Sequence, residues 1–175
     1  IDRLEAQLRD IDTVSGPLRF KVDWREETPG FKYNHWELRG VPFRIEVGPR
    51  DVASESVMLV RRLARAKESL PMAALLQELP GRLGAYQADV FQRALDFREE
   101  HTHAADTLGE MSEILDGVGG FVMAPWCGSA ECERAIAEAN GATIRVIPFD
   151  SPDEAGSCVV DGAPSARRAL FARAY

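Results

Sequence analysis

The feature that most constrains the fold is the way short strand-like segments are interleaved with helical ones. Residues 18–22 and 43–47 alternate apolar and charged side chains, and residues 56–62 form a third short run rich in Val, Met and Leu. Alternation with a period of two predicts strands that are buried on one face. Apolar residues at helical spacing in 1–11, and a second helical pattern in 31–38, lie between or before these runs. Strands and helices in this order predict an α/β fold.

The second half of the chain repeats this alternation after a long helical region. We expect that region to begin at Pro71, to reach about residue 100 and to kink at Pro80-Gly81. Two helices, residues 104–115 and 130–139, and three strands, residues 121–123, 143–147 and 169–175, are expected to follow. The expected divisions are residues 1–70, a linking helical region 71–102, and residues 103–175.

The charge is distributed unevenly along the chain. The net charge is −7, but residues 17–67 carry eleven Lys or Arg against seven Asp or Glu, whereas residues 68–175 carry eight against seventeen. A polyanionic partner is therefore expected to bind the first half. An ordinary solvated surface would carry the same charges, so both interpretations stay open.

The ends and the hydropathy give a further expectation. The chain opens without methionine and within a helical pattern that has no capping residue before it, so we expect a piece of a longer protein. No signal peptide is visible, and no apolar stretch approaches the roughly 20 residues of a membrane helix. We therefore expect a cytoplasmic protein with no membrane partner.

Residues 28–51 hold the densest mixture of aromatic, acidic and arginine side chains. Aromatic rings stack on unpaired bases, and arginine can hydrogen-bond the O6 and N7 of guanine. A carboxylate can accept hydrogen bonds from guanine N1 and N2. The mixture is typical of a single-stranded RNA site, although a strand and a helix with ordinary surface charges would have a similar composition.

The three cysteines and one aspartate form the second candidate group. Cys127 and Cys132 are separated by four residues, and Cys158 and Asp161 by two, with a long insert between the pairs. Paired ligands with a long insert are the usual layout of a structural zinc site. The alternative is that the thiols are small buried apolar groups.

The segment TPGFKYNHWELRGVPFRIEVGPRD, residues 28–51, resembles the anticodon-binding domain of prolyl-tRNA synthetases of the archaeal and eukaryotic type, which some bacteria share. The resemblance continues through Ala124-Pro125-Trp126-Cys127-Gly128, through residues 140–145 and to the terminal Phe171-Ala172-Arg173-Ala174-Tyr175. It implies an anticodon-binding domain with a mixed β-sheet flanked by helices, whose first strand lies upstream of residue 1. A small α/β domain of zinc-binding type is implied to follow.

The resemblance also implies a function for the longer protein. That protein would be a proline–tRNA ligase, a class II synthetase that uses ATP and Mg²⁺ in a catalytic domain absent from these 175 residues. Its implied partners are proline tRNA, the catalytic domain of the same chain and a second copy that binds through that domain. A stand-alone RNA-binding accessory module, and a small redox or metal protein that uses the cysteines, are the alternatives.

Residue roles follow from the same resemblance. The family reads the second and third anticodon bases, both guanine, in this segment. Tyr33 is implied to stack on a base, and Glu37, Arg44, Arg50 and Asp51 are implied to read base edges.

Two further roles concern the tail domain. The family has a fourth cysteine where this chain has Asp161, so the resemblance leaves zinc binding open, and we expect the tail to fold with or without the metal. The terminal carboxylate of Tyr175 is implied to reach towards the active site.

Overall fold

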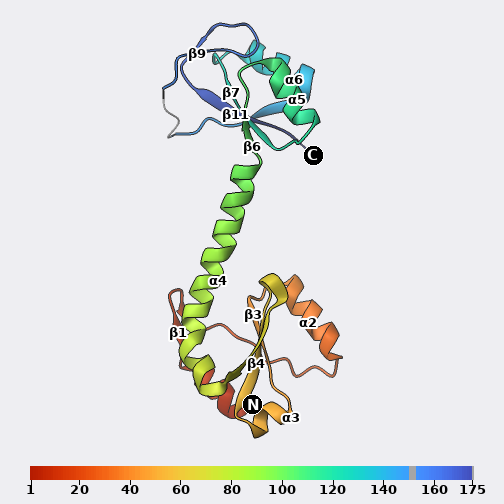
Figure 1. The fold of residues 1–175 in the computed structure, drawn as a ribbon, viewed down its shortest axis with the longest axis vertical. Helices are drawn as coiled ribbons and strands as arrows, with labels where there is room; N and C mark the ends of the chain where they lie inside the picture. Colours follow the sequence, from red (N-terminus) through yellow and green to blue (C-terminus); the bar gives the residue numbers. More distant parts are fainter. Residues whose placement is uncertain (150–152, 175) are drawn as a thin grey trace. The chain divides into compact units, whose positions relative to one another are not determined.

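The computed structural model describes residues 1–149 and 153–174, and the chain divides into two compact units, Ile1–Phe91 and Gln92–Tyr175 (Figure 1). Each unit combines helices with a β-sheet, which confirms the expected α/β class. Tyr175, for which the resemblance implies a role, lies outside the described residues. Among the described helices, none has both the length and the apolar character needed to cross a membrane.

The first unit is built around a small antiparallel sheet. Strands β3 (Phe43–Glu46), β4 (Ser56–Arg61) and β5 (Lys67–Pro71) pair in that order. The remaining elements are α1 (Asp2–Arg9), the short strands β1 (Asp12–Thr13) and β2 (Gly16–Pro17), α2 (Pro29–Leu38), α3 (Pro49–Ala53), the 3-10 turn Leu63–Arg65 and the start of α4 (Met72–Glu100).

The core of the first unit lies on one face of this sheet. Leu4 and Leu8 of α1 and Leu75 of α4 pack against Val57 and Leu59 of β4. Phe43 and Ile45 of β3 border the same cluster. Since side chains alternate along a strand, Arg44 and Glu46 point to the opposite face of β3. Figure 1 shows α2 on the side of the sheet away from α4.

One expectation for this unit is wrong. Residues 18–22 form no strand, although Leu18 and Phe20 still pack on the core. The alternation in residues 18–22 therefore reflects which side chains are partly buried. Among the described residues, no neighbouring strand forms with this segment the ladder of hydrogen bonds that defines a sheet. Both pairings in the described β3–β4–β5 sheet are antiparallel, and the first strand that the resemblance implies upstream of residue 1 is not among these residues.

The second unit does contain a mixed sheet, of order β6-β7-β11-β8. Its strands are β6 (Thr102–Ala104), β7 (Phe121–Pro125), β8 (Ala142–Val146) and β11 (Arg168–Arg173), and β6 pairs with β7 in parallel. Helices α5 (Leu108–Asp116) and α6 (Ala130–Asn140) and the small hairpin of β9 (Gly156–Ser157) and β10 (Pro164–Ser165) complete it. Met111, Val122, Ile136 and Phe171 are fully buried in its core.

The long helix is confirmed, and α4 continues through Pro80 to Glu100. Two strands beside it, β5 and β6, were not expected from the sequence. β6 depends on a close backbone approach: Phe121 N donates to His101 O at 2.8 Å, and a Cβ on Gly120 would lie 2.4 Å from that oxygen. Only glycine fits there, which a periodicity pattern does not reveal.

Candidate functional site

Three of the predicted anticodon residues meet between α2 and β3. Thr28 caps α2 by accepting from Phe31 N, and Pro29 follows as its first residue, so the helix begins at a fixed place. Tyr33 and Glu37 are four residues apart and share one face of α2. That face meets the polar side of β3, which carries Arg44.

Arg44 is the centre of this group. Its Nη1 donates to Glu37 Oε1 at 3.0 Å, and its Nε donates to Glu46 Oε1 at 2.8 Å. Its guanidinium carbon lies 3.7 Å from the centre of the Tyr33 ring. We call Tyr33, Glu37, Arg44 and Glu46 the Arg44 cluster. One cation, two carboxylates and one ring hold each other in place without a ligand.

Exposure differs among the charged members of the cluster. The Arg44 side chain is 17% exposed and that of Glu37 is 26% exposed. Glu37 Oε2 lies 3.7 Å from Arg65 Nη2, and the Arg65 side chain is 83% exposed. The second carboxylate oxygen of Glu37 thus lies near an exposed cation, whereas Arg44 is held from two sides. Burial, with Glu46 nearby, raises the pKa of Tyr33, so its hydroxyl is protonated at neutral pH.

Arg50 and Asp51 lie on α3, which follows β3 after a short turn. Asp51 Oδ2 accepts from Gly48 N at 2.8 Å, which caps the start of α3. The Arg50 side chain is exposed. Neither forms a side-chain hydrogen bond or ion pair with the Arg44 cluster in the described structure. Asp51 therefore has a local structural role whether or not it also contacts a base.

The sequence-based set lacks Glu46 and Arg65. Glu46 had a usable signal, because it lies two residues after Arg44 and so on the same face of a predicted strand. Arg65 had none: it sits in the turn between β4 and β5 with a positive φ of 50°, and only the folded chain brings it to Glu37.

The cysteines and Asp161 also come together, from three separate segments of the second unit. Ser129 caps α6 by accepting from Glu131 N and Cys132 N, which places Cys132 in the first turn. Trp126 Nε1 donates to Ser129 O, and Ser165 Oγ donates to Trp126 O, so the loop that carries Cys127 is held at both ends. The Cys158–Gly162 turn supplies the other two side chains.

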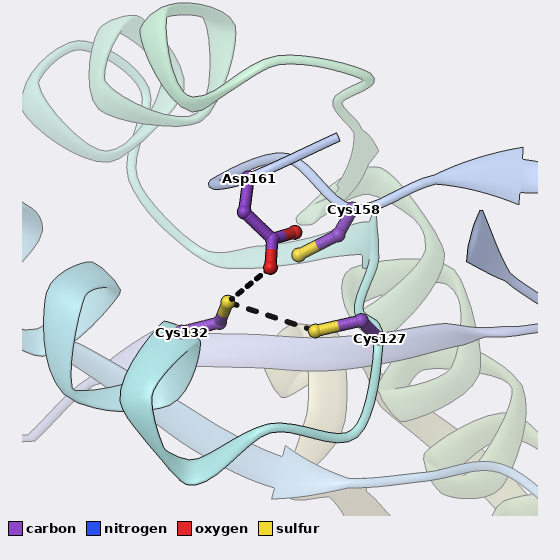
Figure 2. A group of neighbouring side chains, drawn as sticks. All are labelled: Cys127, Cys132, Cys158 and Asp161. Atoms are coloured by element: carbon purple, nitrogen blue, oxygen red, sulfur yellow. Dashed lines mark hydrogen bonds between the residues drawn. The ribbon is translucent and has the colours of Figure 1, made fainter. Parts of the chain in front are cut away.

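The four candidate ligand atoms lie within 4.8 Å of one another (Figure 2). Cys127 Sγ and Cys132 Sγ are 3.6 Å apart, and Cys132 Sγ is 3.3 Å from Asp161 Oδ2. Tetrahedral zinc with Zn–S bonds of about 2.3 Å would separate two thiolates by about 3.8 Å. The donor set and its spacing therefore fit a four-coordinate zinc ion. Ala163 N donates to Asp161 Oδ1 at 3.0 Å, which fixes the carboxylate.

The thiols differ in their local electrostatics. The backbone N–H of Ser129 lowers the pKa of Cys127, whereas burial raises the pKa of Cys132 to about 12. Backbone N–H donation from Ala163 lowers the pKa of Asp161. The four groups contain no positive charge of their own, so a bound divalent cation would favour the thiolates.

Comparison with known proteins identifies the family of both parts of the chain. Residues 1–82 match the family described as "Anticodon binding domain", and residues 108–175 match "Prolyl-tRNA synthetase, C-terminal". Together the two matches cover most of the chain.

Curated relatives include the proline–tRNA ligase of Chloroflexus aggregans, which is 44% identical over 98% of this chain and 36% of its own length. That of Natranaerobius thermophilus is 40% identical over 99% of this chain and 35% of its length. A crystal structure of prolyl-tRNA synthetase from Cryptosporidium parvum complexed with L-proline and AMP is 30% identical, with a TM-score of 0.86 over 99% of this chain and 36% of that one. The chain thus spans about a third of the length of these relatives. It belongs to the prolyl-tRNA synthetase family and carries the anticodon-binding and C-terminal regions of that family.

Proposed function

We propose that this chain recognises the anticodon of proline tRNA as part of a longer proline–tRNA ligase, which joins proline to its tRNA with ATP and Mg²⁺. The observation that carries the proposal is the Arg44 cluster, in which a half-buried arginine fixes two carboxylates beside an aromatic ring. The stand-alone RNA-binding module is not favoured, because the matching relatives are named as ligases and are about three times as long.

The geometry suggests separate roles within the cluster. Glu37 has an oxygen near solvent and accepts from guanine N1 and N2 on the Watson–Crick edge. Arg44, held by Glu37 and Glu46, positions the carboxylate and balances its charge. Tyr33 provides an apolar face for the base, and Arg65 is available to a neighbouring phosphate. Asp51 and Arg50 stay candidates for the second guanine.

Aminoacylation by the full-length protein tests this proposal. Proline tRNA is compared with variants in which each anticodon guanine is replaced by adenine. Replacement should lower kcat/KM by about tenfold or more, since a lost pair of hydrogen bonds to a base costs about 1–3 kcal/mol. Equal kcat/KM for all three tRNAs would refute anticodon reading by this chain.

The second unit is proposed to bind a structural zinc ion through Cys127, Cys132, Cys158 and Asp161. When bound, zinc would supply the positive charge that the four groups lack and would join three segments of the unit. The large apolar core of this unit, which includes Met111 and Phe171, supports folding without it. A carboxylate is a harder ligand than a thiolate, so Asp161 in place of a fourth cysteine lowers the affinity of the site for zinc.

The remaining features of the longer protein are proposals of the same kind. They are the archaeal and eukaryotic type, a cytoplasmic location and a homodimer formed through the catalytic domain. The likeness to the Cryptosporidium parvum structure, along nearly the whole chain, supports the type.

A further inference from the structure

A second group of side chains joins α2 to the segment that precedes it, residues 21–25. Trp36 directly precedes Glu37, and its Nε1 donates to Asp23 Oδ2 at 2.8 Å. Arg25 donates to both oxygens of the same carboxylate, from Nε at 2.9 Å and from Nη2 at 2.6 Å. Asp23 therefore fixes the planes of a guanidinium and an indole. These residues, with Lys21 and Trp24, form what we call the Trp36 pocket.

The pocket has an excess of positive charge. Lys21 Nζ lies 5.5 Å and the Arg25 guanidinium carbon 5.9 Å from the centre of the Trp36 ring, and Asp23 is the one carboxylate among the lining residues. The pocket is open to solvent, has a volume of about 410 Å³ and is also lined by Val22 and His35. Burial and the nearby Arg25 lower the pKa of His35, so the imidazole is neutral at pH 7 and leaves this balance unchanged.

Trp24 is the feature of this pocket that internal packing does not explain. It is 64% exposed, and it takes part in none of the ring–ring or cation–ring contacts of the described residues. An open aromatic ring beside fixed cations is how proteins bind unpaired nucleotides, with the ring under the base and the cations at the phosphate. The volume also suits one nucleotide, because pockets for small ligands begin at about 300 Å³.

We propose that the Trp36 pocket binds one unpaired nucleotide that flanks the two guanines read at the Arg44 cluster. Its base stacks on Trp24, and its phosphate lies at Lys21 and Arg25. The inference rests on the proposed anticodon function, because Trp36 and Glu37 belong to the same helix, α2, so the helix that carries Glu37 also carries one wall of this pocket. Stacking on an indole distinguishes bases weakly, so this contact adds affinity and leaves the choice of sequence to the Arg44 cluster.

The test measures binding of the full-length protein to a 17-nucleotide proline anticodon stem-loop by fluorescence anisotropy. The stem-loop is used intact and with an abasic site at the nucleotide before, or after, the two guanines. Trp24→Ala should weaken binding of the intact stem-loop by about five- to a hundredfold. Trp24→Phe should restore most of it. One abasic site should weaken binding to the wild-type protein and have no further effect on the Trp24→Ala protein.

Charge provides an independent readout. Lys21→Ala should lower the slope of log affinity against log salt concentration by about 0.7, the contribution of one phosphate contact on a single strand. Arg19→Ala is the matched control, because Arg19 is exposed, lies two residues away and does not line this pocket.

The outcomes separate this inference from the function on which it rests. Suppose that the wild-type protein prefers guanine. If Trp24→Ala then leaves the affinity for the intact stem-loop unchanged, or if the abasic sites weaken binding to Trp24→Ala as much as to the wild-type protein, the nucleotide pocket alone is overturned. No preference for guanine in the wild-type protein would overturn the anticodon function, and the inference with it.

Discussion

The two groups of candidate residues achieve order in opposite ways. In the Arg44 cluster a cation is already paired with Glu37 and Glu46, so the unliganded chain holds its shape through its own ion pairs. In the cysteine cluster three thiols and one carboxylate face each other with no cation among them. The first can offer the second oxygen of Glu37 to a base edge while its ion pairs with Arg44 stay in place. The second is positioned by hydrogen bonds, including that from Ala163 N to Asp161, and would gain further order from a ligand of positive charge.

The comparison predicts that Arg44 is the most sensitive position of the first unit. Arg44→Ala leaves Glu46 without its ion pair and leaves Glu37 only the exposed Arg65 as a cationic partner, and hydrogen bonds to charged groups contribute about 1.5–3 kcal/mol each. We expect kcat/KM for aminoacylation by the full-length protein to fall by about a hundredfold. Arg39→Ala is the control, since Arg39 is exposed at the end of the same helix. If both variants lose the same small amount, the cluster is not a recognition site.

Asp51 separates a capping role from a reading role. Asn at this position can still accept from Gly48 N but lacks the charge, so Asp51→Asn should keep the melting temperature of the protein. If Asp51 reads a guanine, discrimination against an adenine replacement should fall by about 1–3 kcal/mol, measured as a ratio of kcat/KM values. If Asp51→Asn discriminates between guanine and adenine as well as the wild-type protein does, the role of Asp51 is limited to capping α3.

Metal analysis tests the cysteine cluster. Protein purified without chelator should contain zinc, and Asp161→Cys should bind it at least about tenfold more tightly. Chelation should lower the melting temperature by several degrees while the far-UV circular dichroism keeps its native form. Unfolding of the second unit on chelation would show that its apolar core is insufficient without the metal.

Ser129 should give the smallest effect. Ser129→Ala removes the cap of α6, which typically costs about 1 kcal/mol of stability. Because Ser129 also positions Cys132, zinc affinity should fall slightly more than it does in Arg134→Ala, which removes an exposed ion pair on the same helix. An equal change in both variants would separate the cap from the metal site.

Local patterns were enough to predict most helices and, except for β5, the longer strands. Sequence patterns found α1, α2, α4, β3 and β4 to within a few residues. One face of α1, α4 and β4 is buried, whereas α2 has no fully buried residue and is bounded by turn residues such as Gly40. Periodicity failed at residues 18–22, where alternate side chains are partly buried although the segment pairs with no strand in the described structure. It also failed at β6, where the close backbone approach at Gly120 allows a strand to follow directly after a long helix. Which strands pair with each other depends on the tertiary structure, and the periodicity of the sequence does not reveal it.

The candidate sites also contain some residues that the sequence predicted and others that only the structure reveals. The Cys127–Asp161 spacing predicted one group, and the structure brings all four side chains together. Resemblance named Tyr33, Glu37 and Arg44, and the structure adds that they touch. Neither source named Arg65 or the Asp23 link between Arg25 and Trp36, because these depend on how loops return to the helix.

The most direct test of the account is the base preference of one carboxylate. Affinities of the full-length protein are measured for the proline anticodon stem-loop and for versions with each guanine replaced by adenine, with wild-type protein and with Glu37→Gln. The wild-type protein should prefer the intact loop by at least about tenfold, and Glu37→Gln should lose most of that preference at one guanine only. The same preference in both proteins would contradict the role assigned to the Arg44 cluster.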